Sequence, residues 1–143
     1  MYSEMRRPTP NDFHKVLSDP LNEVNRKLFP LSIIHTLCDD AYTVVILVKD
    51  EPVLIGGLSI YWQGRGKLWT LFTTKSKRNF VPVFRLMKKY VDGLDIKRVE
   101  LDIPYGDDNL KRRAELLGFT KYADRARCFD SFGEDCTLFE RIN

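Results

Sequence analysis

The chain has 143 residues, 43% of them hydrophobic and 30% charged, which suits a globular protein with a core of its own. A net charge of +3 is too small to indicate a nucleic-acid partner by itself, and no apolar run approaches the roughly 20 residues that cross a bilayer. The length and the lack of repeats or linkers lead us to expect one domain, residues 1–143, and three cysteines without C-x-x-C spacing and no apolar signal segment indicate a reducing cytoplasm.

The N-terminal part is predicted to be helical. At most a short edge strand precedes Pro8. Asn11 is a candidate cap for a helix over residues 12–29, where apolar side chains recur near helical spacing. Pro20 interrupts that pattern, so we expect a kink or two short helices, with another helical turn over 31–37.

A β-hairpin is predicted next. Residues 42–48 are apolar on both faces, as in a strand inside a sheet, and residues 53–62 return as its partner after a turn. Gly56 and Gly57 lie inside the returning strand, which indicates either a bulge or a place where another group approaches the backbone closely.

The centre of the chain predicts a βαβ unit. A turn over 63–67 leads into an apolar strand from Leu68, and a basic loop over 73–79 follows. Residues 80–94 carry the apolar stripe of an amphipathic helix, and residues 99–103 alternate as a second strand. Two strands joined through a helix should be parallel neighbours.

The C-terminal part predicts a short helix and two strands. The helix covers residues 109–117 and ends at Gly118. Residues 127–128 and 136–141 are the candidate antiparallel strands, with a hairpin loop between them.

Three segments in this order resemble the GNAT acyltransferases, the Gcn5-related N-acetyltransferases: PVLIGGLSIYW, LWTLFTTKSKRNF and RRAELLGFTKY. Small acetyltransferase-like internal proteins of short-tailed bacteriophages are also similar, since a basic K-x-K-R loop precedes their long helix. The resemblance implies an α/β (α+β) fold with a mixed, mostly antiparallel central sheet, a central βαβ unit and flanking helices. It also implies the host cytoplasm or the virion as the location.

In GNAT enzymes the loop after the fourth strand carries Gln/Arg-x-x-Gly-x-Gly/Ala, whose backbone N–H groups hold the pyrophosphate of acetyl-CoA. Here the loop contains no glycine, although its lysines and arginine offer charge and its hydroxyls offer hydrogen bonds. The alternative is a solvated basic loop. The acetyl-CoA-binding residues that the resemblance implies are Phe72, Thr73, Thr74, Lys75, Ser76, Lys77, Arg78 and Asn79.

The catalytic positions also depart from the family. Many GNAT enzymes have a tyrosine where this chain has Ala114, and a glutamate on the fourth strand, which is absent from residues 69–74. The replacements that we name are Asp102 as general base and Tyr105 as general acid. The alternatives are that Asp102 is a solvated or capping carboxylate and that Tyr105 packs against the turn.

Two functions follow from the resemblance. The first is an acetyl-CoA-dependent N-acyltransferase with a modified pyrophosphate loop, acting on an amine-bearing substrate. The second is a catalytically silent GNAT-fold phage protein that binds host or virion proteins. A carboxylate in the anion pocket of the loop would argue against the first.

Nucleic acid, metal and membrane are less favoured by the sequence. Nucleic-acid binding through the basic cluster is the weaker third alternative. His14 and His35 have no cysteine or carboxylate at metal-ligand spacing, so no metal site is predicted, and no membrane partner is expected.

Overall fold

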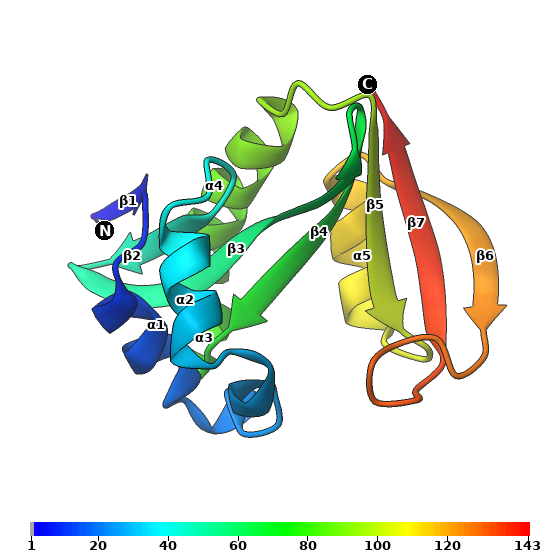
Figure 1. Cartoon of the computed structure of the whole chain (residues 1–143). Coiled ribbons are helices and arrows are strands. Elements are labelled where there is room, and N and C mark those ends of the chain that lie inside the picture. The colour runs from blue at the N-terminus through cyan, green and yellow to red at the C-terminus, as the bar shows by residue number, and fades with distance from the viewer. Residues whose placement is uncertain (1) are drawn as a thin grey trace. The chain divides into compact units, whose positions relative to one another are not determined.

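The computed structural model describes residues 2–143 and shows the predicted mixed α/β fold, with seven strands and flanking helices (Figure 1). The strands are β1 (Ser3–Arg6), β2 (Val44–Val48), β3 (Glu51–Trp62), β4 (Arg65–Phe72), β5 (Arg98–Pro104), β6 (Thr120–Ala126) and β7 (Cys136–Ile142). The α-helices are α1 (Pro10–Leu17), α2 (Leu31–Cys38), α3 (Thr74–Arg78), α4 (Phe80–Asp92) and α5 (Asp108–Leu116). Within residues 2–143, no helix has both the length and the apolar character needed to span a membrane.

The sheet is mostly antiparallel and contains the predicted βαβ unit. Hydrogen-bonded neighbours follow the order β1-β2-β3-β4-β5-β7-β6. Strands β4 and β5 are parallel, with a register from Arg65↔Arg98 to Lys67↔Glu100, and helices α3 and α4 connect them in sequence. Strand β4 begins at Arg65, inside the predicted turn, because its first residues pair with β5.

The contacts divide the chain into two compact units, to which β3 and β4 both contribute residues. Unit 1 comprises the residues up to Leu58 together with Trp69–Asp92. Unit 2 comprises Ser59–Leu68 and Gly93–Asn143. The expectation of one domain over residues 1–143 stays a prediction.

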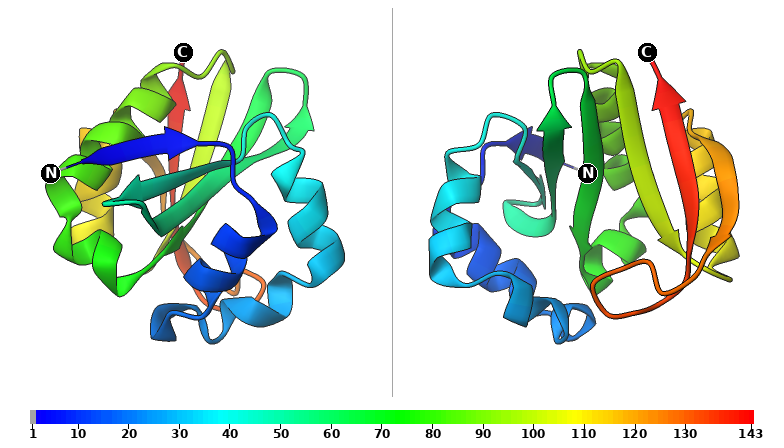
Figure 2. Two further views of the ribbon diagram at one scale, coloured as in Figure 1. Left: turned by 90° about the vertical axis from the view of Figure 1, so that its left-hand side faces the viewer. Right: turned by 45° about the vertical axis from the view of Figure 1, so that its right-hand side comes forward.

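In unit 1, helices cover both faces of β2 and β3 (Figure 2). On one face α1 and α2 bury Phe13, Val16 and Ile34 against Val45 and Ile55. On the other face Val83 of α4 packs against β2 and β3. The strand pair, apolar on both faces as predicted for residues 42–48, is therefore buried between two hydrophobic clusters.

The helical region of residues 12–29 begins earlier and breaks sooner than predicted. Helix α1 is capped by Thr9, not by Asn11, through a capping box with Asp12. After α1 the chain forms two 3-10 helices, Pro20–Asn22 and Asn25–Leu28, which agrees with the expected interruption at Pro20.

The glycine pair of β3 marks a close approach, one of the two alternatives that the sequence left open. A Cβ at Gly57 would lie 2.9 Å from the indole ring of Trp69, and one at Gly56 would lie 3.1 Å from the Trp69 carbonyl oxygen. Only glycine lets the backbone of β3 pass this close to Trp69.

In unit 2, β7 pairs antiparallel with both β5 and β6, and α5 lies along one face of these strands (Figure 2). Gly118 ends the helical segment with a φ of 89°, as expected of a C-terminal glycine. The prediction of a strand at residues 127–128 was wrong, because the strand that pairs with β7 is Thr120–Ala126. Strand β6 is largely exposed and lacks the alternation of apolar and polar residues that would indicate a strand.

Candidate functional site

The predicted phosphate loop is folded into a short helix. Thr73 caps α3: its backbone N–H donates to Ser76 Oγ at 3.0 Å, and the Ser76 N–H donates to Thr73 Oγ1 at 3.2 Å. The Thr73 hydroxyl also donates to the carbonyl of Val53 at 2.6 Å, and the Lys77 N–H donates to the carbonyl of Thr73 at 3.3 Å. Several polar groups that a bound phosphate would need are therefore used inside the protein.

A carboxylate from the N-terminal region lies at the start of this helix. Asp19 Oδ2 accepts hydrogen bonds from the Thr74 N–H at 3.1 Å and from the Thr74 hydroxyl at 2.9 Å. Burial raises the pKa of the Asp19 carboxyl, but hydrogen bonds from Leu21 and Thr74 outweigh it and lower the pKa overall. Asp19 thus stays ionised and supplies a built-in anion where the resemblance places a diphosphate.

The basic side chains of the loop differ in their partners. Lys75 forms an exposed ion pair with Glu51, and the hydrogen bond from Lys75 lowers the pKa of the Glu51 carboxyl. Within residues 2–143, Lys77 and Arg78 form no ion pair. These two side chains are the cations of the loop that stay available to a ligand.

The two ends of the predicted binding segment serve the structure of unit 1. Phe72 packs against the core between α4 and the hairpin of β2 and β3. The side-chain amide of Asn79 donates to the carbonyl of Lys75 at 2.9 Å, which closes the end of α3. Neither contact resembles a ligand site.

Two hollows adjoin the Lys75–Glu51 pair, which lines both of them. One, of about 440 Å³, is also lined by Lys15 and Asp19, and the other, of about 380 Å³, by Lys49 and Arg78. The first contains as many carboxylates as lysines, so its walls offer no excess of positive charge to a diphosphate.

The cap at Thr73 carries a testable stability effect. We expect Thr73→Ala to lower the free energy of unfolding by about 1–2 kcal/mol, because it removes the cap and the buried bond to Val53. Thr74→Ala, which loses only the exposed contact with Asp19, should cost less than about 0.5 kcal/mol. Urea unfolding followed by circular dichroism measures both, and equal losses would contradict this role of Thr73.

The predicted general base, Asp102, is held by a lysine of the neighbouring strand. Its carboxylate forms an ion pair with Lys67 of β4, and the Asp102 side chain is only 14% exposed. Burial lowers the pKa of the Lys67 ammonium, but the hydrogen bond and charge of Asp102 outweigh it and raise that pKa overall. The Asp102 carboxylate is therefore part of an ion pair within unit 2 and not a solvated group.

The predicted general acid, Tyr105, is a platform for two cations. The Arg125 guanidinium lies 4.5 Å from the ring centroid and the Lys111 ammonium 5.3 Å from it. In the part of the chain that the structure describes, no hydrogen bond joins Tyr105 to Asp102. The two residues share unit 2 but do not form a hydrogen-bonded acid–base pair.

A buried glutamate was missed by the sequence analysis. Glu100 of β5 is buried and accepts from Arg65 Nη2 at 3.1 Å and from Arg98 Nε at 2.9 Å, and Arg98 also pairs with Glu140 of β7. The hydrogen bond from Arg65 is the largest cause of a lowered pKa at Glu100. The alternation of charged and apolar residues in β5 could have placed Glu100 on a face, but not beside Arg65.

These elements, taken with the strand order, define the fold of the GNAT acetyltransferases, and comparison with solved structures agrees. The ribosomal-protein-S5-alanine acetyltransferase from Vibrio fischeri matches with a TM-score of 0.76 at 12% identity, over 100% of this chain and 94% of that one. A GNAT-family acetyltransferase from Streptococcus pneumoniae gives 0.72 at 11%, over 99% of both chains. A chimera of the spermidine N-acetyltransferase from Vibrio cholerae gives 0.71 at 12%, over 99% and 96%.

At these identities the likeness establishes the GNAT fold alone. No protein-family model matches the sequence, and no curated protein does.

Proposed function

We propose that this chain uses the GNAT fold as a binding protein and does not turn over acetyl-CoA. The observation that carries the proposal is the Asp19 carboxylate, which accepts from the backbone and the hydroxyl of Thr74 at the start of α3. A diphosphate at that position would have to displace an ionised side chain of the protein itself, with like-charge repulsion opposing it.

Three further features support a silent site. The loop has no glycine to let a phosphate reach the backbone, Ala114 stands at the position of the family's tyrosine, and Asp102 is paired with Lys67. Transfer to an amine would therefore lack both the usual acid and a free base. Under this proposal the chain is a phage product that acts on host or virion proteins, in the host cytoplasm or the virion.

The second candidate is an acetyl-CoA-dependent N-acyltransferase. It is favoured by the match to acetyltransferases over 99% or more of this chain. In that case Asp19 would be displaced when the cofactor binds, and positioning alone would supply part of the rate. Phe72 to Asn79 would then hold acetyl-CoA, with Asp102 and Tyr105 as base and acid.

One experiment separates the two candidates. We expect millimolar acetyl-CoA to raise the melting temperature of the wild-type chain by less than about 1 °C, because a ligand stabilises only a state that it binds. We also expect no release of free CoA thiol with spermidine or with a peptide that starts with alanine. These are acceptors of the kinds that two of the similar structures are named for.

Asp19→Ala tests whether the Asp19 carboxylate is what keeps acetyl-CoA from binding. The control is Asp95→Ala, because Asp95 is exposed and forms no ion pair among the described residues. Under the proposal neither variant releases CoA. Steady CoA release by the wild-type chain would overturn the proposal. A gain of acetyl-CoA binding in Asp19→Ala alone would support it, by showing that this carboxylate closes the site.

A further inference from the structure

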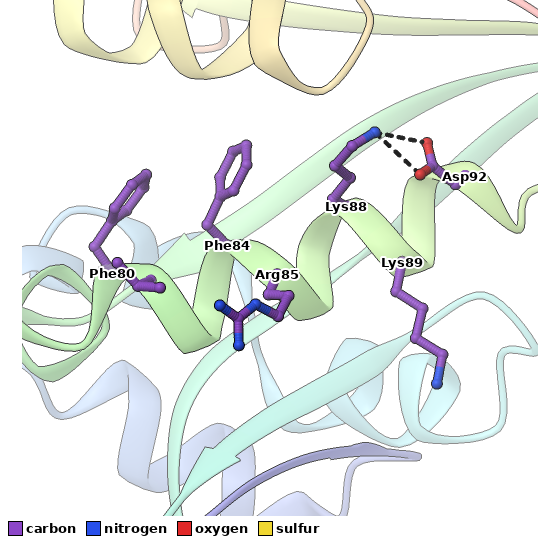
Figure 3. A pocket seen from close by; sticks show the side chains of 7 residues that line it. Phe80, Phe84, Arg85, Lys88, Lys89 and Asp92 are labelled. Carbon is purple, nitrogen blue, oxygen red and sulfur yellow. Dashed lines mark hydrogen bonds and ion pairs between the residues drawn. The ribbon is translucent and has the colours of Figure 1, made fainter. Parts of the chain in front are cut away.

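One face of α4 presents two rows of side chains at four-residue spacing. Figure 3 shows Phe80, Phe84 and Lys88 on one side and Arg85 and Lys89 on the other, and Val81 extends the second row. These side chains and Asp92 line a hollow of about 510 Å³ on the surface of α4, the α4 groove. Residues four apart on a helix form a ridge, and the groove beside such a ridge is where a partner's side chains pack.

Part of the lining of this groove is apolar, contributed by Phe80, Val81 and Phe84. The rings of Phe80 and Phe84 lie 5.2 Å apart, and the Val81 side chain is 61% exposed. Exposed apolar surface bounded by polar residues is typical of a site that another molecule covers.

The rim of the groove is basic and only partly neutralised. Lys88 pairs with Asp92, at 3.1 Å, but within residues 2–143 Arg85 and Lys89 form no ion pair. The helices α3 and α4 together carry half of the lysines and arginines of unit 1, against the single carboxylate of Asp92: Lys75, Lys77, Arg78, Arg85, Lys88 and Lys89. An acidic partner would meet a favourable field here.

We propose that the α4 groove binds an acidic segment of a partner protein, with an aromatic side chain of that segment against Val81 and Phe84. The inference rests on the proposed binding function and names the surface and the partner's chemistry. Carboxylates of the segment pair with Arg85 and Lys89, one helical turn apart. A nucleic acid fits this groove less well. Nucleic-acid binding relies on many contacts between cations and phosphates, and the groove offers two unpaired cations beside apolar side chains.

The test uses three labelled probes whose fluorescence anisotropy reports binding: a glutamate–tyrosine copolymer, polyglutamate of matched length and single-stranded oligothymidylate. We expect the copolymer to bind about tenfold more tightly than polyglutamate, because its aromatic rings remove apolar surface from water in the groove. Val81→Ser should remove most of that difference. The double variant Arg85→Glu/Lys89→Glu should weaken copolymer binding by about tenfold or more.

A matched control is Arg7→Glu/Lys27→Glu, which changes the net charge equally at two exposed cations of unit 1 outside α4. It should leave copolymer binding within about twofold, because neither residue lines the groove and exposed charges that make no direct contact contribute little at physiological salt. An equal loss in both double variants, equal affinity for the two polypeptides, or no copolymer binding would overturn the inference. So would tighter binding of oligothymidylate that is lost in the α4 variant.

The same preparations, tested with acetyl-CoA, keep the two proposals separate. CoA release together with the expected copolymer pattern would overturn the proposed function and leave the inference about the α4 groove standing. Absence of both CoA release and copolymer binding would overturn only the inference about the α4 groove. Melting curves of each variant show that the protein being measured is folded.

Discussion

Phe13→Ala should lower the free energy of unfolding by about 3–5 kcal/mol, a large part of the stability of a small domain. Phe13 is fully buried in the cluster that joins α1 and α2 to β2 and β3, and its ring lies 6.2 Å from that of Phe29. Removing the ring deletes apolar contacts and leaves a cavity that the strands cannot fill, because they are fixed by their hydrogen bonds.

The measurement is urea unfolding followed by tryptophan fluorescence. Trp69 packs against the same cluster, with its ring 5.8 Å from Phe29, so its emission reports on unit 1. Phe13→Leu keeps most of the volume and should cost less than about 1.5 kcal/mol. Val24→Ala, at an exposed position, should stay within about 0.5 kcal/mol. A loss below about 1 kcal/mol in Phe13→Ala would contradict the packing of α1 in this core.

The core elements could be predicted because their signals are local. Helices α1 and α4 and strands β2 and β3 each carry an apolar spacing that one segment displays by itself, and burial follows from it. A glycine inside a strand pattern is a local signal as well, but it left a bulge and a close approach both open, and the structure places Trp69 beside Gly57.

The candidate site was predicted less well because its contacts are not local. Thr73 and Ser76 form a capping box in which serine replaces the usual glutamate, so the segment was interpreted as an open loop. Asp19 reaches Thr74 across 55 positions of sequence, and Lys67 reaches Asp102 only through the register of β4 and β5. No residue pattern within one segment displays such pairs.

Glu100→Gln should cost about 2 kcal/mol of unfolding free energy at neutral pH, because it leaves two guanidinium groups without the carboxylate that they share. The cost stays below that of a fully buried pair, since the side chains of Arg65 and Arg98 are about a third exposed and water screens them. The loss should depend on pH in a way that a packing defect would not.

The direction of this pH dependence follows from the lowered pKa of the Glu100 carboxyl, whose ordinary value is 4.5. A carboxyl with a lower pKa in the folded than in the unfolded chain stabilises the fold above the unfolded pKa, and this stabilisation is lost as the pH falls through the folded pKa. The difference in stability between the wild-type chain and Glu100→Gln should therefore be greatest near pH 7 and shrink below pH 4.5. Urea unfolding at several pH values measures this difference, in which the titration of groups that do not interact with Glu100 or its arginines cancels. Glu115→Gln, at an exposed position on α5, should match the wild-type chain throughout. A difference for Glu100→Gln that stays constant down to pH 3 would show that the amide disturbs packing, and that the charge of Glu100 does not hold β4, β5 and β7 together.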